Sequence, residues 1–134
     1  MTTQQVVVRY RSGRTLKGIT SDFKPHREAF TIEESLPGAA SRPVEVRLEE
    51  LKAVFFVHSL EGNRDYSERK LQLPKDKIGR PLLVTFRDGE AIRGTSVGAG
   101  LHGNGFYLFP ADPRSNNKRI FVIRSAVEEL REEK

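Results

Sequence analysis

Two glycine-rich segments of the chain match patterns that carry chemistry in other proteins. The segment Gly94-Thr95-Ser96-Val97-Gly98 matches a nucleophile elbow, and residues 98–103 match the glycine spacing of a dinucleotide-binding loop. Both patterns need a helix behind them, either to support the serine or to place a helix N-terminus against a pyrophosphate. Here Asn104-Gly105 and a strand-like segment follow instead. We therefore predict a bent strand and a loop, with no catalytic serine and no cofactor.

The remaining candidates for catalysis or metal binding are scattered along the chain. His26, His58 and His102 are widely separated, and the chain has no cysteine, so they do not form a zinc ligand set. The pairs Glu33-Glu34 and Glu49-Glu50 are adjacent in sequence, and neighbours on a strand point to opposite faces. These residues supply no combination of nucleophile, base and orienting group. We therefore expect a protein that is not an enzyme and binds no metal.

Positive charge is concentrated near the start of the chain. The whole chain has a formal net charge of +5, and residues 6–27 contain six basic residues against Asp22 alone. A basic stretch of this kind can bind the phosphate backbone of a nucleic acid, but it can equally be solvated surface, and both interpretations stay open here. The candidate nucleic-acid contacts are Arg9, Arg11, Arg14, Lys17, Lys24 and Arg27.

An internal repeat places these residues in a larger pattern. Adding 76 to each residue number lays residues 6–54 over residues 82–130 without a gap. Glycines, aromatic residues and apolar residues keep their spacing across the whole alignment, which indicates two copies of one small unit. A unit of this size buries too little apolar surface to be stable alone. We therefore expect the two copies to pack as one body.

Each copy has the pattern of an antiparallel meander. Apolar and polar residues alternate on both sides of a Ser12-Gly13 turn in the first copy and an Asp88-Gly89 turn in the second, which predicts a hairpin in each. A second hairpin follows in both copies, and the first copy adds a fifth strand at residues 52–57. In the second copy, Ser125 is expected to cap a short C-terminal helix with Glu128 three residues later. No closing strand is expected there.

These patterns define an all-β fold of two tandem units. We assign residues 1–58 to the first unit, 59–80 to a polar linker and 81–134 to the second unit with its helix. The N-terminal residues lack a signal-peptide pattern, and the longest apolar run, residues 53–57, is too short to span a bilayer. A chain without cysteine fits a reducing compartment, so the expected location is the cytoplasm, with no membrane partner.

The first hairpin of each copy resembles a known motif. Residues 6–18 and 82–94 read apolar-x-apolar-x-aromatic-x-Ser/Asp-Gly-x-x-apolar-x-Gly. This pattern resembles the first motif of Sm-like domains, which are five-stranded SH3-like barrels, many of which bind single-stranded RNA. The resemblance implies two tandem SH3/Sm-like barrels and makes RNA a possible partner.

Other segments resemble a bacterial family. Residues 51–57, 86–90 and 115–122 are similar to an uncharacterised family related to proteins that carry PilZ domains. This resemblance implies a bacterial protein with a role in signalling. The Arg-x-x-x-Arg motif with which PilZ domains read cyclic di-GMP does not occur in the chain, so no nucleotide cofactor is implied.

The two copies differ on the outward face of the second hairpin. The first copy places Thr31, Glu33, Glu45 and Arg47 there, whereas the second places large apolar residues. Leaving such side chains in water forgoes about 1.5–3 kcal/mol each, so something should cover them. The cover can be the other copy, a protein partner or a second chain. The candidate interface residues are Tyr107, Phe109, Phe121 and Ile123.

Two functional hypotheses follow. The first is a non-enzymatic interaction module that binds a protein partner or itself through the apolar face of the second copy. The alternative is a nucleic-acid-binding module that uses the basic residues of the first copy, in which case affinity would fall steeply with salt.

Overall fold

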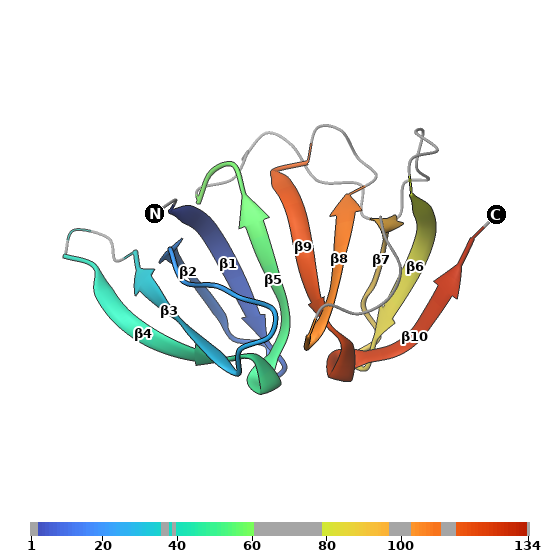
Figure 1. Cartoon of the computed structure of the whole chain (residues 1–134), viewed down its shortest axis with the longest axis horizontal. Helices are drawn as coiled ribbons and strands as arrows, with labels where there is room; N and C mark the ends of the chain where they lie inside the picture. Colours follow the sequence, from blue (N-terminus) through green and yellow to red (C-terminus); the bar gives the residue numbers. More distant parts are fainter. Residues whose placement is uncertain are drawn as a thin grey trace.

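The described residues fold into one antiparallel sheet of ten strands (Figure 1). A computed structural model describes residues 3–35, 38, 40–60, 79–96, 103–110 and 115–133. The first half contains β1 (Gln4–Tyr10), β2 (Thr15–Thr20), β3 (Ala29–Glu34), β4 (Arg42–Arg47), the 3-10 turn η1 (Leu48–Glu50) and β5 (Leu51–Val57). The second half contains β6 (Arg80–Phe86), β7 (Ala91–Ser96), β8 (Gly105–Pro110), β9 (Asn117–Ile123), the 3-10 turn η2 (Arg124–Ala126) and β10 (Val127–Glu132). The all-β prediction is confirmed.

The order of the strands in the sheet is β10-β6-β7-β8-β9-β5-β1-β2-β3-β4. The predicted first hairpins are present as β1–β2 and β6–β7, and their turns place Gly13 and Gly89 at φ +96° and +93°. Glycine adopts this left-handed conformation without steric cost, which explains the tight turns. Most of the predicted linker, residues 61–78, lies outside the described residues.

The two halves have the same elements at the same spacing. β1, β2, β3 and η1 have the bounds of β6, β7, β8 and η2 after 76 is added to each residue number. The backbone N–H of Arg11 donates to Glu50 O at 3.0 Å, and the equivalent N–H of Arg87 donates to Ala126 O at 3.1 Å. A Cβ atom at Gly18 would lie 2.2 Å from the carbonyl oxygen of Glu33 on β3. A Cβ atom at the equivalent Gly94 would lie 2.4 Å from the carbonyl oxygen of Phe109 on β8.

The prediction of a C-terminal helix is wrong. Ser125 lies in η2, and the residues after it form β10, which pairs with β6. Pairing satisfies the backbone groups along β6, whereas a helix as short as the one expected within residues 125–134 is marginal unless tertiary packing stabilises it. The expectation that the second half lacks a closing strand is wrong for the same reason. β10 pairs with β6 as β5 pairs with β1.

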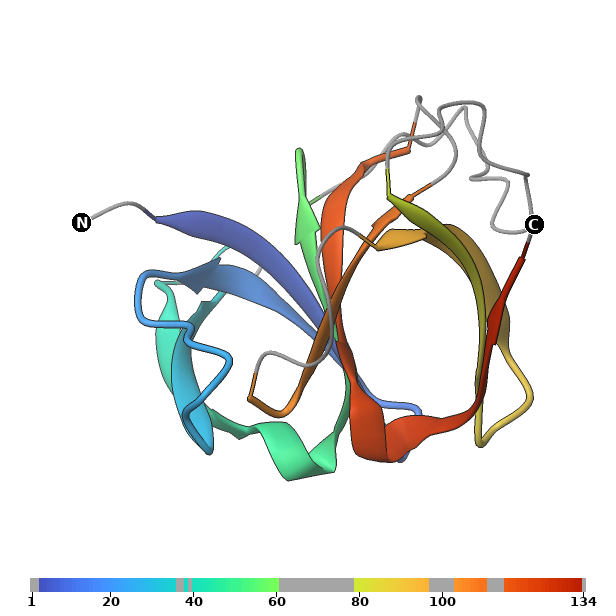
Figure 2. The same ribbon diagram turned by 45° about the vertical axis from the view of Figure 1, so that its right-hand side comes forward.

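The core is continuous across the two halves. All seven residues of β5 are buried, and β5 pairs with β1 on one side and β9 on the other. Figure 2 shows that each half of the sheet curls, with β5 and β9 side by side between the halves. Val54 lies opposite the buried Val8, so it faces the interior of the first half, while Phe55 lies opposite Ile120 of the second. The described residues contain no helix long and apolar enough to cross a membrane.

Candidate functional site

The predicted interface residues lie mostly at the junction between the two halves. Phe121 and Ile123 are 0% and 2% exposed, Tyr107 is half-buried, and Phe109 is the only one of the four that is clearly exposed, at 37%. The Phe121 ring packs edge-on against Phe23, from the loop between β2 and β3, at 5.4 Å between centroids. It also packs against Tyr107 at 5.0 Å. The cover for this face is therefore mainly the first half of the same chain.

The equivalent face of the first half remains in solvent. Thr31, Glu33, Glu45 and Arg47 are all exposed, as their polarity requires. Glu45 occupies the position of Phe121 after the shift of 76. A further unit docked on β4 in the same manner would have to bury the Glu45 carboxylate. The junction therefore forms once within the chain.

The basic residues predicted on the first hairpin have different environments. Arg9 forms an ion pair with Glu90 at 3.4 Å and lies over the Phe55 ring, so its charge is already partly neutralised. Lys17 is exposed on the outer face of β2. Arg14 is exposed and lies 5.5 Å from the centre of the Tyr10 ring.

The loop that carries Lys24 and Arg27 is tied to the second half. The side-chain amide of Asn104 donates to the carbonyl oxygens of Pro25 at 2.9 Å and Arg27 at 3.0 Å. The Asn104 carbonyl in turn accepts from the backbone N–H of Arg124 in η2 at 3.0 Å. Arg27 and η2 therefore lie on the two sides of Asn104. Lys24 and Arg27 themselves are exposed.

The turn η2 also fixes the arginines of the two equivalent hairpins. The Arg11 side chain donates to the Ser125 hydroxyl, and Nε of Arg87 donates to the Ser125 carbonyl oxygen at 3.0 Å. Both 3-10 turns lie at the bottom of the view in Figure 1. We name this region the basic end and define it by five exposed arginines, Arg11, Arg14, Arg27, Arg87 and Arg124.

The arginines of the basic end have no acidic partner among the described residues. Within the part of the chain that the structure describes, no carboxylate oxygen lies within 4.0 Å of any of these five side chains. Arg87 and Arg124 were not among the basic residues predicted from the sequence. Arg87 could have been found, because it aligns with Arg11 at the repeat distance.

A buried lysine connects the halves beside the basic end. Lys52 is 7% exposed, and its Nζ lies 2.8 Å from a carboxylate oxygen of Asp88 and also bonds to Glu90. The ammonium lies 4.6 Å from the centre of the Phe86 ring, a favourable cation–π distance. The ion pairs of Lys52 were not predicted from the sequence either. Its signal is a lysine inside the apolar segment of β5 together with the acidic Asp88-Gly89-Glu90 turn.

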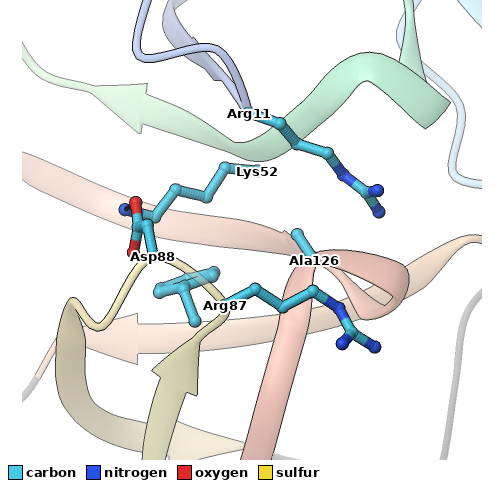
Figure 3. Close-up of a pocket in the computed structure, with 6 residues that line it drawn as sticks. Arg11, Lys52, Arg87, Asp88 and Ala126 are labelled. Atoms are coloured by element: carbon cyan, nitrogen blue, oxygen red, sulfur yellow. Dashed lines mark hydrogen bonds and ion pairs between the residues drawn. The ribbon is translucent and has the colours of Figure 1, made fainter.

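A small cavity opens between these groups. Its volume is about 80 Å³, and it is lined by Arg11, Lys52, Phe86, Arg87, Asp88 and Ala126. In Figure 3 the side chains of Arg11 and Arg87 extend in the same direction, while Lys52 points to Asp88 on the other side. Most of the cavity lining is apolar, and the Arg11 and Arg87 side chains extend away from the Lys52–Asp88 pair at its other side.

Comparison with known protein families gives a match that covers the whole described region. One family, described as of unknown function and designated DUF6982, matches residues 2–133. The chain belongs to DUF6982. No curated protein and no solved structure matches this DUF6982 chain.

The other candidate catalytic and metal-binding residues of this DUF6982 chain do not form a common site within the described residues. Gly94, Thr95 and Ser96 belong to β7, as a strand prediction requires, whereas residues 97–102, including His102, lie outside the described residues. His26 and His58 are exposed. No three histidine, aspartate or glutamate side chains among the described residues are grouped as metal ligands.

The ion pairs of Lys52 with Asp88 and Glu90 make the stability of the DUF6982 chain depend on pH. The hydrogen bond from Lys52 is the main cause that lowers the pKa of Asp88, and the Glu90 N–H adds to it. Since the folded pKa is below that of the unfolded chain, about 3.9, the stabilisation is present above that pH and is lost as the pH falls through the folded pKa. We expect the urea midpoint to drop between pH 5 and pH 2 more in the native protein than in Asp88→Asn. Equal drops in the two proteins would contradict a role for this carboxylate.

Proposed function

We propose that the chain is a non-enzymatic binding module of two SH3/Sm-like β units whose basic end binds single-stranded nucleic acid. The observation that carries the proposal is that Arg11, Arg14, Arg27, Arg87 and Arg124, from four loops and turns, lie at one end and have no carboxylate partner among the described residues. Following the sequence resemblance, we place the module in the bacterial cytoplasm.

The geometry suits phosphate groups along a strand. A guanidinium group binds phosphate through two parallel hydrogen bonds, and unneutralised arginines in one region attract a polyanion. Arg14 lies over the Tyr10 ring and offers a planar cation beside an aromatic group. Bases of a single strand stack on surfaces of this kind with little sequence preference.

A role in binding protein has less support. Among the described residues, the exposed large apolar side chains are Ile19, Phe109 and Leu130, one on each of β2, β8 and β10. Single exposed apolar side chains are common on protein surfaces and do not mark an interface. Since Phe121 and Ile123 are buried within the chain, the surface that motivated the protein-partner hypothesis is largely absent.

The equivalence of the two halves supports the proposed two-barrel description. β5 closes onto β1 and β10 closes onto β6, and both halves have a 3-10 turn directly before the closing strand. A five-stranded unit with this order of elements is the arrangement that the Sm-like resemblance implies. We propose that one such unit was duplicated and that its second copy acquired an apolar outer face.

Binding should be measured with a fluorescent single-stranded RNA at several salt concentrations. If three to five arginines each contact a phosphate, log K should fall with log salt with a slope of about −2 to −3.5. The double variant Arg11→Gln/Arg87→Gln should bind more weakly and have a shallower slope. Arg42→Gln is the matched control, because Arg42 lies on β4 and is paired with Glu34 at 2.8 Å. Absence of binding at low salt, or equal loss in the control, would rule out the basic end as the site.

A further inference from the structure

Asn104, directly before β8, holds the loop between β2 and β3 against the second half of the chain. Its side-chain amide donates to the carbonyl oxygens of Pro25 and Arg27 at 2.9 and 3.0 Å, and its backbone N–H donates to Pro25 O at 3.0 Å. This approach requires glycine at position 103, where φ is +63° and a Cβ atom would collide with the Pro25 carbonyl oxygen. Three hydrogen bonds therefore fix the backbone of Arg27 relative to the second half.

The side-chain bonds of Asn104 have no counterpart in the first half. The equivalent residue after the shift of 76 is Glu28, whose carbonyl oxygen accepts from the N–H of Leu48 at 2.9 Å, as that of Asn104 accepts from Arg124 at 3.0 Å. The side chain of Glu28 is 90% exposed, and its carboxylate lies 3.9 Å from Arg47. The backbone bond thus belongs to the fold of each unit, whereas the Asn104 side chain serves the contact between the halves.

This contact joins arginines that are far apart in the sequence. The carbonyl oxygen of Arg27 and the N–H of Arg124 both bond to Asn104, so their backbones lie on either side of it. Arg124 precedes Ser125, which accepts hydrogen bonds from the other two side chains of the group. Asn104 and η2 therefore connect four exposed arginines, two from each half: Arg11 and Arg27 from the first, Arg87 and Arg124 from the second.

Resting on the proposed function, we infer that Asn104 is a positioning residue of the nucleic-acid site, which holds Arg27 beside Arg124 so that one strand contacts arginines of both halves. The Asn104 amide donates to two carbonyl oxygens of the protein, so it acts through Arg27 and not on the ligand itself. Fixing the Arg27 loop in advance reduces the entropy that binding would otherwise lose.

The test is a double-mutant cycle, read by binding of a fluorescent single-stranded RNA at several salt concentrations. Arg27→Gln removes one phosphate contact, so affinity at low salt should fall about tenfold and the salt slope should decrease by about 0.7. Asn104→Ala should lower affinity about three- to tenfold and make the slope shallower, although no charge is changed. The double variant should bind about as well as Arg27→Gln alone, because the two residues act as one unit.

Asn116→Ala is the matched control. The Asn116 side chain also joins the halves, since it donates to Ser59 O at 2.8 Å and accepts from the Ser59 N–H at 3.1 Å. It precedes β9 and Ser59 follows β5, so the pair lies at the opposite ends of these strands from η1 and η2. Both asparagine variants should lower the urea midpoint, but Asn116→Ala should keep the native affinity and salt slope.

The outcomes separate the inference from the function on which it rests. Native affinity in Asn104→Ala, or losses that add in the double variant, would overturn the positioning role and leave nucleic-acid binding in place. An equal loss of affinity in Asn116→Ala would also overturn it, because any loosening between the halves would then weaken binding. Absence of RNA binding by the native protein at low salt would overturn both the proposed function and the inference.

Discussion

Phe121→Ala is expected to lower the free energy of unfolding by about 3–5 kcal/mol. Phe121 is 0% exposed and lies opposite Val54 in the pairing of β9 with β5. Its ring contacts Phe23 of the first half and Tyr107 of the second. Alanine would remove both aromatic contacts and leave a void at the junction, where the strands on each side prevent collapse. The effect is large because the same ring belongs to the packing of both halves.

Phe109→Ala provides the matched control for this prediction. Phe109 is 37% exposed and lies on the neighbouring strand β8, so the same change in chemistry should cost only about 1 kcal/mol. Urea unfolding of the native protein and the two variants gives the comparison. The junction would not contribute as described if the two variants lost similar amounts of stability. Loss of cooperativity in Phe121→Ala alone would show that the two halves had become independent.

The predictive value of the sequence was highest where the pattern is local. Alternation around Ser12-Gly13 and Asp88-Gly89 predicted both first hairpins, because a turn of two residues fixes the register of the strands beside it. The contrast between Glu45 and Phe121 also showed that only one outer face needed cover. Which element covers it is a long-range question, and the answer includes Phe23 from a loop that carries no periodic pattern.

The C-terminal segment shows why local reasoning failed there. Ser125 followed by Glu128 is a helix-capping pattern, and Glu128, Glu129 and Glu132 favour a helix over a strand. The edge of β6 outweighs this preference, since a strand on that edge satisfies backbone groups that a short helix would leave unpaired. The repeat itself held the correct signal, because residues 127–133 align with β5. Aligning this segment with β5 through the repeat, before considering its helix propensity, would have predicted a strand.

The candidate site could be found only in part. Arg11 and Arg14 belong to the basic stretch that the composition of residues 6–27 reveals. Arg87 aligns with Arg11 at the repeat distance, but the contact of both side chains with Ser125 depends on η2 lying against the first hairpin, and no spacing in the sequence encodes that contact. The same holds for Lys52 and Asp88, which are 36 residues apart and belong to different halves.

Lys52→Ala should lower the free energy of unfolding by about 2 kcal/mol. Loss of one partner from a fully buried ion pair costs about 3–5 kcal/mol, because the other charge stays buried and unpaired. Here the side chains of Asp88 and Glu90 are 53% and 27% exposed, so both can be hydrated after the change and the loss is smaller. The alanine also removes the contact with the Phe86 ring and the packing of the lysine stem.

Lys52→Met separates the charge from the packing. Methionine keeps most of the apolar stem against Phe86 but cannot pair with Asp88 or Glu90, so we expect a loss between that of Lys52→Ala and the native protein. It should also remove the acid-dependent stability attributed to Asp88, since Lys52 is the main cause of its lowered pKa. Urea unfolding at pH 7 and pH 3 measures both effects. If Lys52→Met matched the native protein at both values of pH, the ion pairs would contribute nothing and the lysine would act through its stem alone. A larger loss in Lys52→Met than in Lys52→Ala would contradict a stabilising contact between the lysine stem and the Phe86 ring.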